Sequence, residues 1–163
     1  MSRAPSSAGF TLIEALIVLA VTAILATLAG PSFIGVIAKH RAKAAASDLH
    51  LAMIKARSEA LKRNVTVKIN PDAAGWQNGW RIQDENSSGC SSASPCVIDN
   101  YSEAKAVAIT GGPASVEYQS SGRVKGSAAP AFLITSTAIA SVQRCVFVST
   151  SGRPAVKEGG TCP

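Results

Sequence analysis

Gly9-Phe10-Thr11-Leu12-Ile13-Glu14 opens the stretch of sequence that decides how this chain folds. It leads into an apolar run that ends at about Ala38, and residues 15–38 contain no charged side chain. Because a helix rises about 1.5 Å per residue, about 20 apolar residues are enough to cross the hydrocarbon core of a bilayer. We therefore predict a helix over residues 10–38 that is long enough to lie in a membrane.

The short polar segment in front of this run places a candidate cleavage site before the apolar residues. An ordinary secretory signal is cut after its apolar region, so that the region is lost. Cleavage at Gly9 would instead leave the helix on the mature protein. Glu14 lies at the edge of the apolar run, where a carboxylate is costly and is therefore a functional candidate.

This arrangement resembles the class III leader of type IV pilins and of type II secretion pseudopilins. The resemblance rests on the leader length, Gly9, Phe10, Glu14 and the uninterrupted apolar run. It implies that a prepilin peptidase cleaves after Gly9 and N-methylates Phe10. It also implies that Glu14 pairs with the new α-amino group of a neighbouring subunit. The alternatives are a plain single-pass anchor and, for Glu14, a solvated carboxylate at headgroup level.

The helix is expected to continue past the apolar run, with a kink or local melting at Gly30-Pro31. Proline lacks a backbone donor and clashes with the preceding turn. Pro31 either marks the membrane exit or, as the resemblance implies, lets the helix melt when subunits pack into a filament. Beyond it, apolar residues recur every three or four positions, which predicts an amphipathic helix ending at about Arg63, before Asn64.

After Asn64 the pattern changes to short runs with a period of two, separated by turn residues. One long helix followed by short strands predicts an α+β fold with an antiparallel sheet packed on the helix. Trp76 and Trp80 are expected in the core, and exposed stacking platforms for bases are the alternative. An exposed loop is expected at 84–95, and strands are expected at 65–69, 76–82, 97–98, 106–109, 115–118, 131–135, 142–149 and 153–156.

Four cysteines follow the apolar run: Cys90, Cys96, Cys145 and Cys162. They form no Cys-x-x-Cys pair, and neither histidine is close to them in sequence, so we expect no metal site. An even number of cysteines in a translocated domain favours disulfides. Of the three connectivities that four cysteines allow, we favour Cys90–Cys96 and Cys145–Cys162.

The net charge of +6 is unevenly distributed along the chain. Residues 39–63 hold seven Lys or Arg against two acids (+5), residues 64–117 hold three against six (−3), and residues 118–163 hold five against one (+4). Basic segments at both ends indicate contact with a polyanion or with anionic headgroups, and the alternative is a solvated face.

The chain beyond the apolar run resembles the GspH/FimT family of minor pilins and pseudopilins. Residues 56–64, the Gly75-Trp76 and Gly79-Trp80 pairs, and a repeated Ser-Gly-Arg at 121–123 and 151–153 carry this resemblance. FimT-like members implicated in DNA uptake have a Gly-Arg-x-Arg motif near the C-terminus, of which this chain keeps the first two residues and has Ala155 in place of the last. Turn cations are therefore candidate phosphate contacts: Arg123, Lys125, Arg153 and Lys157.

The sequence contains no Gly-rich phosphate loop and no recognisable catalytic set, so we expect neither an enzyme nor a cofactor. We predict a leader over 1–9, a transmembrane or filament-core helix over 10–38 and a periplasmic α+β domain over 39–163. The predicted function is that of a minor pilin, anchored in the inner membrane, that joins other pilins to initiate or cap a type IV pilus. The alternatives are a GspH-like pseudopilin of type II secretion and a FimT-like DNA-binding protein at the pilus tip.

Overall fold

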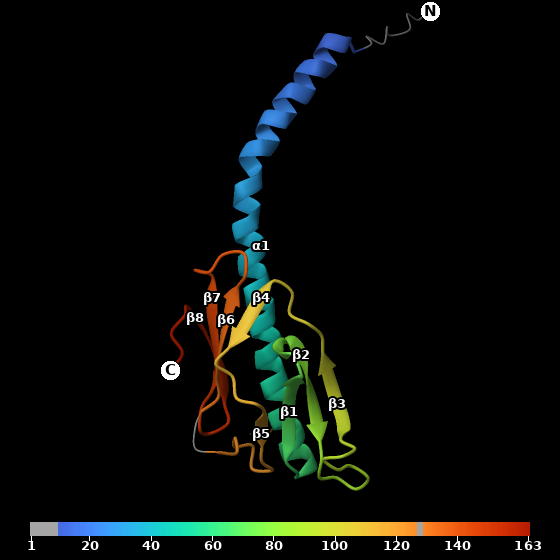
Figure 1. The fold of residues 1–163 in the computed structure, drawn as a ribbon, viewed down its shortest axis with the longest axis vertical. Coiled ribbons are helices and arrows are strands. Elements are labelled where there is room, and N and C mark those ends of the chain that lie inside the picture. Colours follow the sequence, from blue (N-terminus) through green and yellow to red (C-terminus); the bar gives the residue numbers. More distant parts are fainter. Residues whose placement is uncertain (1–9, 127–128) are drawn as a thin grey trace, which may run out of the picture. The chain divides into compact units, whose positions relative to one another are not determined.

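The computed structural model describes residues 10–126 and 129–163 (Figure 1). Within these residues it contains one helix, α1 (Leu12–Arg63), followed by eight strands. The chain divides after Gly35 into two compact units, and the second, residues 36–163, holds all eight strands.

The long helix begins and ends with recognisable caps. At its start the backbone N–H of Glu14 donates to Oγ1 of Thr11 at 3.3 Å, which is half of a capping box. At its end Asn64 adopts a left-handed conformation (φ 56°), and the N–H of Val65 donates to the carbonyl of Ala60 at 3.3 Å. This is the Schellman arrangement, in which the residue after the helix turns the chain away. The predicted end of the helix at Arg63 is therefore confirmed.

Of the kink or local melting expected at Gly30-Pro31, local melting is wrong for the single chain, and the kink stays a prediction. The backbone of α1 is helical through both residues. Proline removes only one hydrogen bond, and the preceding residues 25–29, Leu-Ala-Thr-Leu-Ala, include good helix formers. Melting within a filament stays a prediction.

No helix in the part of the chain that the structure describes is long and apolar enough to cross a membrane. The membrane span over residues 10–38 therefore stays a prediction.

The strands form two antiparallel sheets of four strands each, and an α+β fold is confirmed. The sequence pattern predicted a single sheet. The first sheet has the order β3-β2-β1-β5, from β1 (Val67–Asp72), β2 (Gly75–Asp84), β3 (Cys96–Tyr101) and β5 (Val116–Tyr118). The second has the order β4-β6-β7-β8, from β4 (Val107–Thr110), β6 (Ala131–Ser136), β7 (Gln143–Val148) and β8 (Pro154–Glu158).

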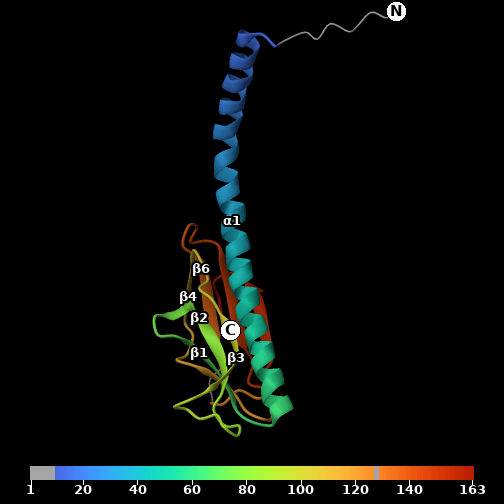
Figure 2. The ribbon, with the colours of Figure 1, turned by 90° about the vertical axis from the view of Figure 1, so that its right-hand side faces the viewer.

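Both sheets lie beside the second half of α1 in the two perpendicular views (Figures 1 and 2). The buried face of this half of the helix is built largely from alanine, and small side chains let the sheets approach closely. The helix residues in the core cluster are Ala42, Ala45, Ala46, Leu49, Ala52, Met53, Ala56 and Ala60. The core therefore lies between the helix and the inner faces of both sheets.

The two tryptophans are core residues, as predicted. Both Trp76 and Trp80 are buried, and the ring of Trp76 meets Phe132 edge-on with ring centroids 4.8 Å apart. The indole N–H of Trp76 donates to the carbonyl of Pro113 at 2.9 Å. This bond satisfies the one polar group that the buried indole carries.

The two disulfides, Cys90–Cys96 and Cys145–Cys162, have the predicted connectivity. The first closes the loop between β2 and β3, and the second fastens the C-terminus to β7. The second pair is separated by 17 residues. Closing a loop of that size stabilises the folded state by roughly 3 kcal/mol in the chain-entropy description.

Candidate functional site

The start of α1 carries the residues that the leader resemblance assigned to processing and assembly. Gly9 lies outside the described residues. Phe10 and Glu14 are exposed, and Glu14 is the acidic residue of the first helical turn. A carboxylate there also complements the positive end of the helix dipole. Glu14 therefore has a local role as well as the predicted one between subunits.

Thr11 is a residue that the sequence analysis missed. Its hydroxyl caps the helix through the N–H of Glu14. The signal was present, because Thr-x-x-Glu before an apolar run is the sequence form of a capping box.

The apolar side chains that follow are open to solvent in the single chain. The large apolar residues between Leu12 and Leu25 are all exposed. An apolar surface of this extent marks a region that binds lipid or other proteins.

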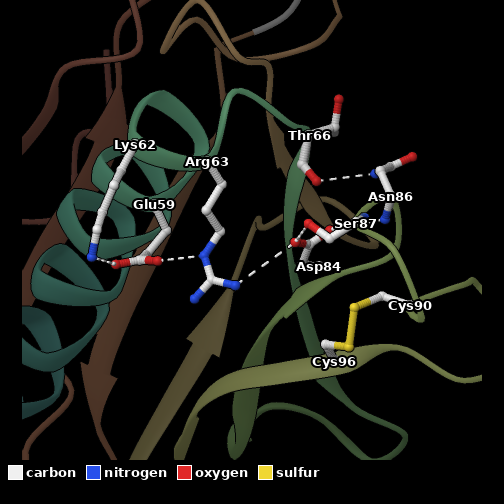
Figure 3. A network of polar contacts seen from close by, with 9 residues as sticks. All are labelled: Glu59, Lys62, Arg63, Thr66, Asp84, Asn86, Ser87, Cys90 and Cys96. Atoms are coloured by element: carbon white, nitrogen blue, oxygen red, sulfur yellow. Dashed lines mark hydrogen bonds and ion pairs between the residues drawn. A yellow bond between two sulfur atoms is a disulfide. The ribbon is translucent and has the colours of Figure 1, made fainter.

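A network of polar side chains joins the end of α1 to the loop that the Cys90–Cys96 disulfide closes (Figure 3). The sequence did not predict this network. The buried carboxylate of Asp84 accepts hydrogen bonds from the N–H groups of Asn86 and Ser87, at 2.8 and 3.0 Å, and from the Ser87 hydroxyl. Arg63 lies 3.9 Å from Asp84 and donates to Glu59 at 2.6 Å. The network thereby joins the last helical turn to the loop that Cys90–Cys96 closes.

The two carboxylates of this network have lowered pKa values. Burial raises the pKa of Asp84, but the hydrogen bonds from Ser87 and Asn86 outweigh it and bring the pKa below its usual value. The hydrogen bond from Arg63 lowers the pKa of Glu59. Both groups are therefore ionised at neutral pH, and the network is held by charge.

The repeated Ser-Gly-Arg forms two turns with the same hydrogen bonds. In one, the N–H of Gly122 donates to the carbonyl of Gln119 at 2.8 Å, and the N–H of Gln119 donates to the carbonyl of Arg123 at 2.9 Å. In the other, Gly152 and Arg153 bond to Ser149 in the same way, at 2.8 and 2.9 Å. Gly122 and Gly152 have φ of 73° and 82°, the left-handed region that glycine adopts at least cost.

These twin turns, residues 119–123 and 149–153, pack against each other and onto α1. A Cβ atom on Gly152 would lie 2.0 Å from the carbonyl oxygen of Gly122 and 3.2 Å from Cα of Arg123. A Cβ atom on Gly122 would lie 3.2 Å from side-chain atoms of both Arg57 and Leu61. The structure therefore brings Arg123 and Arg153 together beside the last turns of the helix.

The two lysines of the predicted phosphate site are placed differently. Lys125 forms an ion pair with Glu117 at 2.9 Å, and its hydrogen bond to Glu117 raises its pKa. Lys157 lies within β8, opposite Cys145 on β7, so its predicted position on a turn is wrong. The period-two pattern predicted a strand that ends at Val156, whereas pairing with β7 extends β8 to Glu158. In the described residues no group of His, Cys, Asp or Glu is arranged to hold a metal.

Comparison with known proteins assigns the chain to a family. Residues 45–152 match the profile of the type II transport protein GspH. The chain belongs to the GspH family. Residues 5–30 of this GspH-family chain match the prokaryotic N-terminal methylation motif. Together these matches make it a minor pilin or pseudopilin of the GspH/FimT type, a pilin-type structural protein.

The fold of this GspH-family chain is also found in solved structures. Two crystal forms of the type IV minor pilin FimU of Pseudomonas aeruginosa match it with TM-scores of 0.60 and 0.59, each at 18% identity. Each match covers 74% of this chain, and they cover 91% and 96% of the FimU chains. At this identity the likeness shows the fold alone. No curated protein is significantly similar in sequence.

Proposed function

We propose that this protein is a minor pilin of a type IV pilus that helps to initiate or cap the filament. The observation that carries the proposal is a GspH domain with the fold of a type IV minor pilin, preceded by an N-terminal methylation motif and an exposed apolar helix. The disulfides favour a domain on the oxidising, periplasmic side of the inner membrane.

In this proposal a prepilin peptidase cuts after Gly9 and frees the α-amino group of Phe10. The exposed apolar side chains of α1 then pass from lipid into contact with other pilins, which keeps them out of water. Glu14 pairs with the amino group of a neighbouring subunit, because an unpaired carboxylate in such surroundings is costly. The rival role is that of a pseudopilin in type II secretion, to which the family's name refers.

The two roles are separated by deleting the gene in its host. We expect the deletion to abolish or strongly reduce surface pili, counted by electron microscopy, and to leave type II secretion unchanged. The wild-type gene should restore pili, whereas Gly9→Val should not, because a branched side chain blocks close approach of the peptidase to the backbone. Ala8→Val, the same increase in size one residue earlier, is the matched control. Lost secretion with normal pili would assign the protein to the secretion system.

A second candidate function, DNA binding at the pilus tip, is favoured by the twin turns. They bring the backbone of Gly152, next to Arg153, against that of Arg123, and neither arginine makes an ion pair within the described residues. Phosphate contacts of this kind bind DNA of any sequence and weaken with salt. The candidate site consequently centres on two of the four predicted cations.

Titration of residues 36–163 with duplexes of unrelated sequence tests this second function. We expect weak binding whose log–log salt slope falls by about two units when Arg123 and Arg153 are both changed to Ala, since each phosphate contact contributes roughly −0.9. Lys125→Ala with Lys157→Ala removes the same charge and should change the slope less, because Glu117 already holds Lys125. Absence of binding at low salt would remove DNA from the function, and equal effects of the two double variants would reject the twin turns as the site.

A further inference from the structure

The face of α1 that points away from the core carries an exposed apolar stripe. Leu51, Ile54 and Leu61 are 54, 43 and 51% exposed, and Ile37, earlier on the same face, is 46% exposed. The residues between them are exposed as well, and apart from Ala44 they are polar: His40, Ser47 and Ser58. These eight positions follow one another at alternating steps of three and four residues. We call residues 37, 40, 44, 47, 51, 54, 58 and 61 the outer seam.

The spacing of the outer seam indicates that its partner is another helix. Steps of three and four give a period of 3.5 residues, which keeps a stripe facing a second helix along a coiled-coil seam. The sheets use the opposite face of α1, where Leu49, Met53 and Ala56 are fully buried. Of the large apolar residues of the outer seam, Leu61 packs against the turn of Gly122, whereas the core contacts of α1 do not account for Leu51 and Ile54.

The residues flanking the outer seam are mostly basic. Five Lys or Arg stand against one acid, Asp48, which gives +4; the five are Arg41, Lys43, Lys55, Arg57 and Lys62. Lys55 is already paired with Asp99, and Lys62 lies 4.0 Å from Glu59. Arg41, Lys43 and Arg57 make no ion pair within the described part of the chain.

The basic residues that flank the outer seam form a positive rim, and the twin turns extend this rim at one end. Leu61 contacts the turn of Gly122, and that turn holds Arg123 next to the turn of Arg153. A second copy of this chain would oppose one basic rim to another, and like charges across a seam disfavour that pairing. Charge complementarity instead selects a helix with an acidic rim.

We propose that the outer seam binds an amphipathic helix of a different filament subunit, whose apolar stripe is flanked by Asp and Glu. The proposal rests on the proposed function, since it takes the protein to be part of a filament. Leucine and isoleucine at the seam supply the apolar contact, and the basic rim selects the partner.

The unit 36–163 is suited to a direct test. It contains every residue of the buried core and both disulfides, so it has what it needs to fold without the first unit. The probes are two synthetic helical peptides of about four heptads, with the same Leu and Ile seam and with either Glu or Lys at all flanking positions. Binding is followed by fluorescence anisotropy, and circular dichroism checks the fold of every variant.

We expect the Glu-flanked peptide to bind at least about tenfold more tightly than the Lys-flanked one. Leu51→Gln with Ile54→Gln should weaken binding of the Glu-flanked peptide by about tenfold or more, because it removes two apolar contacts of the seam. Val97→Gln with Val156→Gln is the matched control. It removes two exposed apolar side chains, 55 and 40% exposed, from strands that lie outside the seam, and should bind as wild type.

Three results would overturn the proposal: equal affinity for the two peptides, no binding of either, or self-association of the unit through Leu51 and Ile54 in sedimentation. The gene deletion reads out the proposed function independently. If the unit binds the Glu-flanked peptide but deletion of the gene leaves pili intact, the outer seam is a helix-binding site and the pilus role is rejected. If deletion abolishes pili but the unit binds neither peptide, the pilus role stands and the outer seam is rejected as a helix-binding site.

Discussion

Glu14→Val is expected to lower incorporation of the protein into pili by at least about tenfold, while its amount in the membrane stays unchanged. The reason is that a charge in apolar surroundings is costly when its partner is missing. Removing one partner of a desolvated ion pair leaves the other charge unpaired, which costs about 3–5 kcal/mol. Because about 1.4 kcal/mol changes an equilibrium constant tenfold, this cost is more than enough for a tenfold loss of incorporation. The measurement is the amount of the protein in sheared pili relative to the membrane fraction.

The helix cap supplies the control for this experiment. Thr11→Ala removes the hydroxyl that accepts from the N–H of Glu14, at a cost of about 1 kcal/mol to the start of the helix. If Glu14 acts between subunits, Thr11→Ala should incorporate nearly as well as wild type, and Glu14→Gln should behave like Glu14→Val. If Thr11→Ala lowered incorporation as much as Glu14→Val, the role of Glu14 would be to stabilise the first turn of the helix. Normal incorporation of Glu14→Val would contradict both roles.

The parts of the fold that the sequence predicted are those with local causes. The helix end follows from Asn64, which adopts the left-handed conformation more readily than most residues. The strands follow from period two, and the cysteine pairs join neighbours in sequence. Local melting at Pro31 was predicted from one residue, and it is wrong because the loss of one backbone hydrogen bond does not interrupt a helix that is otherwise continuous from Leu12 to Arg63.

What the sequence could not show depends on contacts between distant residues. Asp84 looks like any loop acid until Arg63, from the helix end, lies against it. Lys125 and Arg123 are equivalent as turn cations in the sequence, yet only Lys125 meets an acid, Glu117. The Ser-Gly-Arg repeat was visible, but its hydrogen bonds lie within each turn, and nothing local indicates that the two turns touch.

That contact between the turns leads to the largest effect we expect on the stability of the folded domain. Gly152→Ala should lower the free energy of unfolding of residues 36–163 by about 3 kcal/mol. The left-handed φ of 82° accounts for about 1 kcal/mol, because alanine tolerates it less well than glycine. The rest comes from overpacking, typically about 1–3 kcal/mol, since the new Cβ would lie 2.0 Å from the carbonyl oxygen of Gly122. That oxygen belongs to the backbone of a hydrogen-bonded turn and cannot rotate away.

Gly89→Ala separates the two causes. Gly89 has a nearly identical φ of 85°, but a Cβ there would meet nothing within 4 Å, so this variant should lose only about 1 kcal/mol. Urea unfolding with both disulfides intact measures the two changes, and equal losses would reject close packing of the turns. Gly152→Ala also leaves every charge in place. If Arg123 and Arg153 bind phosphate together, the variant should weaken DNA binding without any loss of cations, because the turn that carries Arg153 must move away from the turn that carries Arg123.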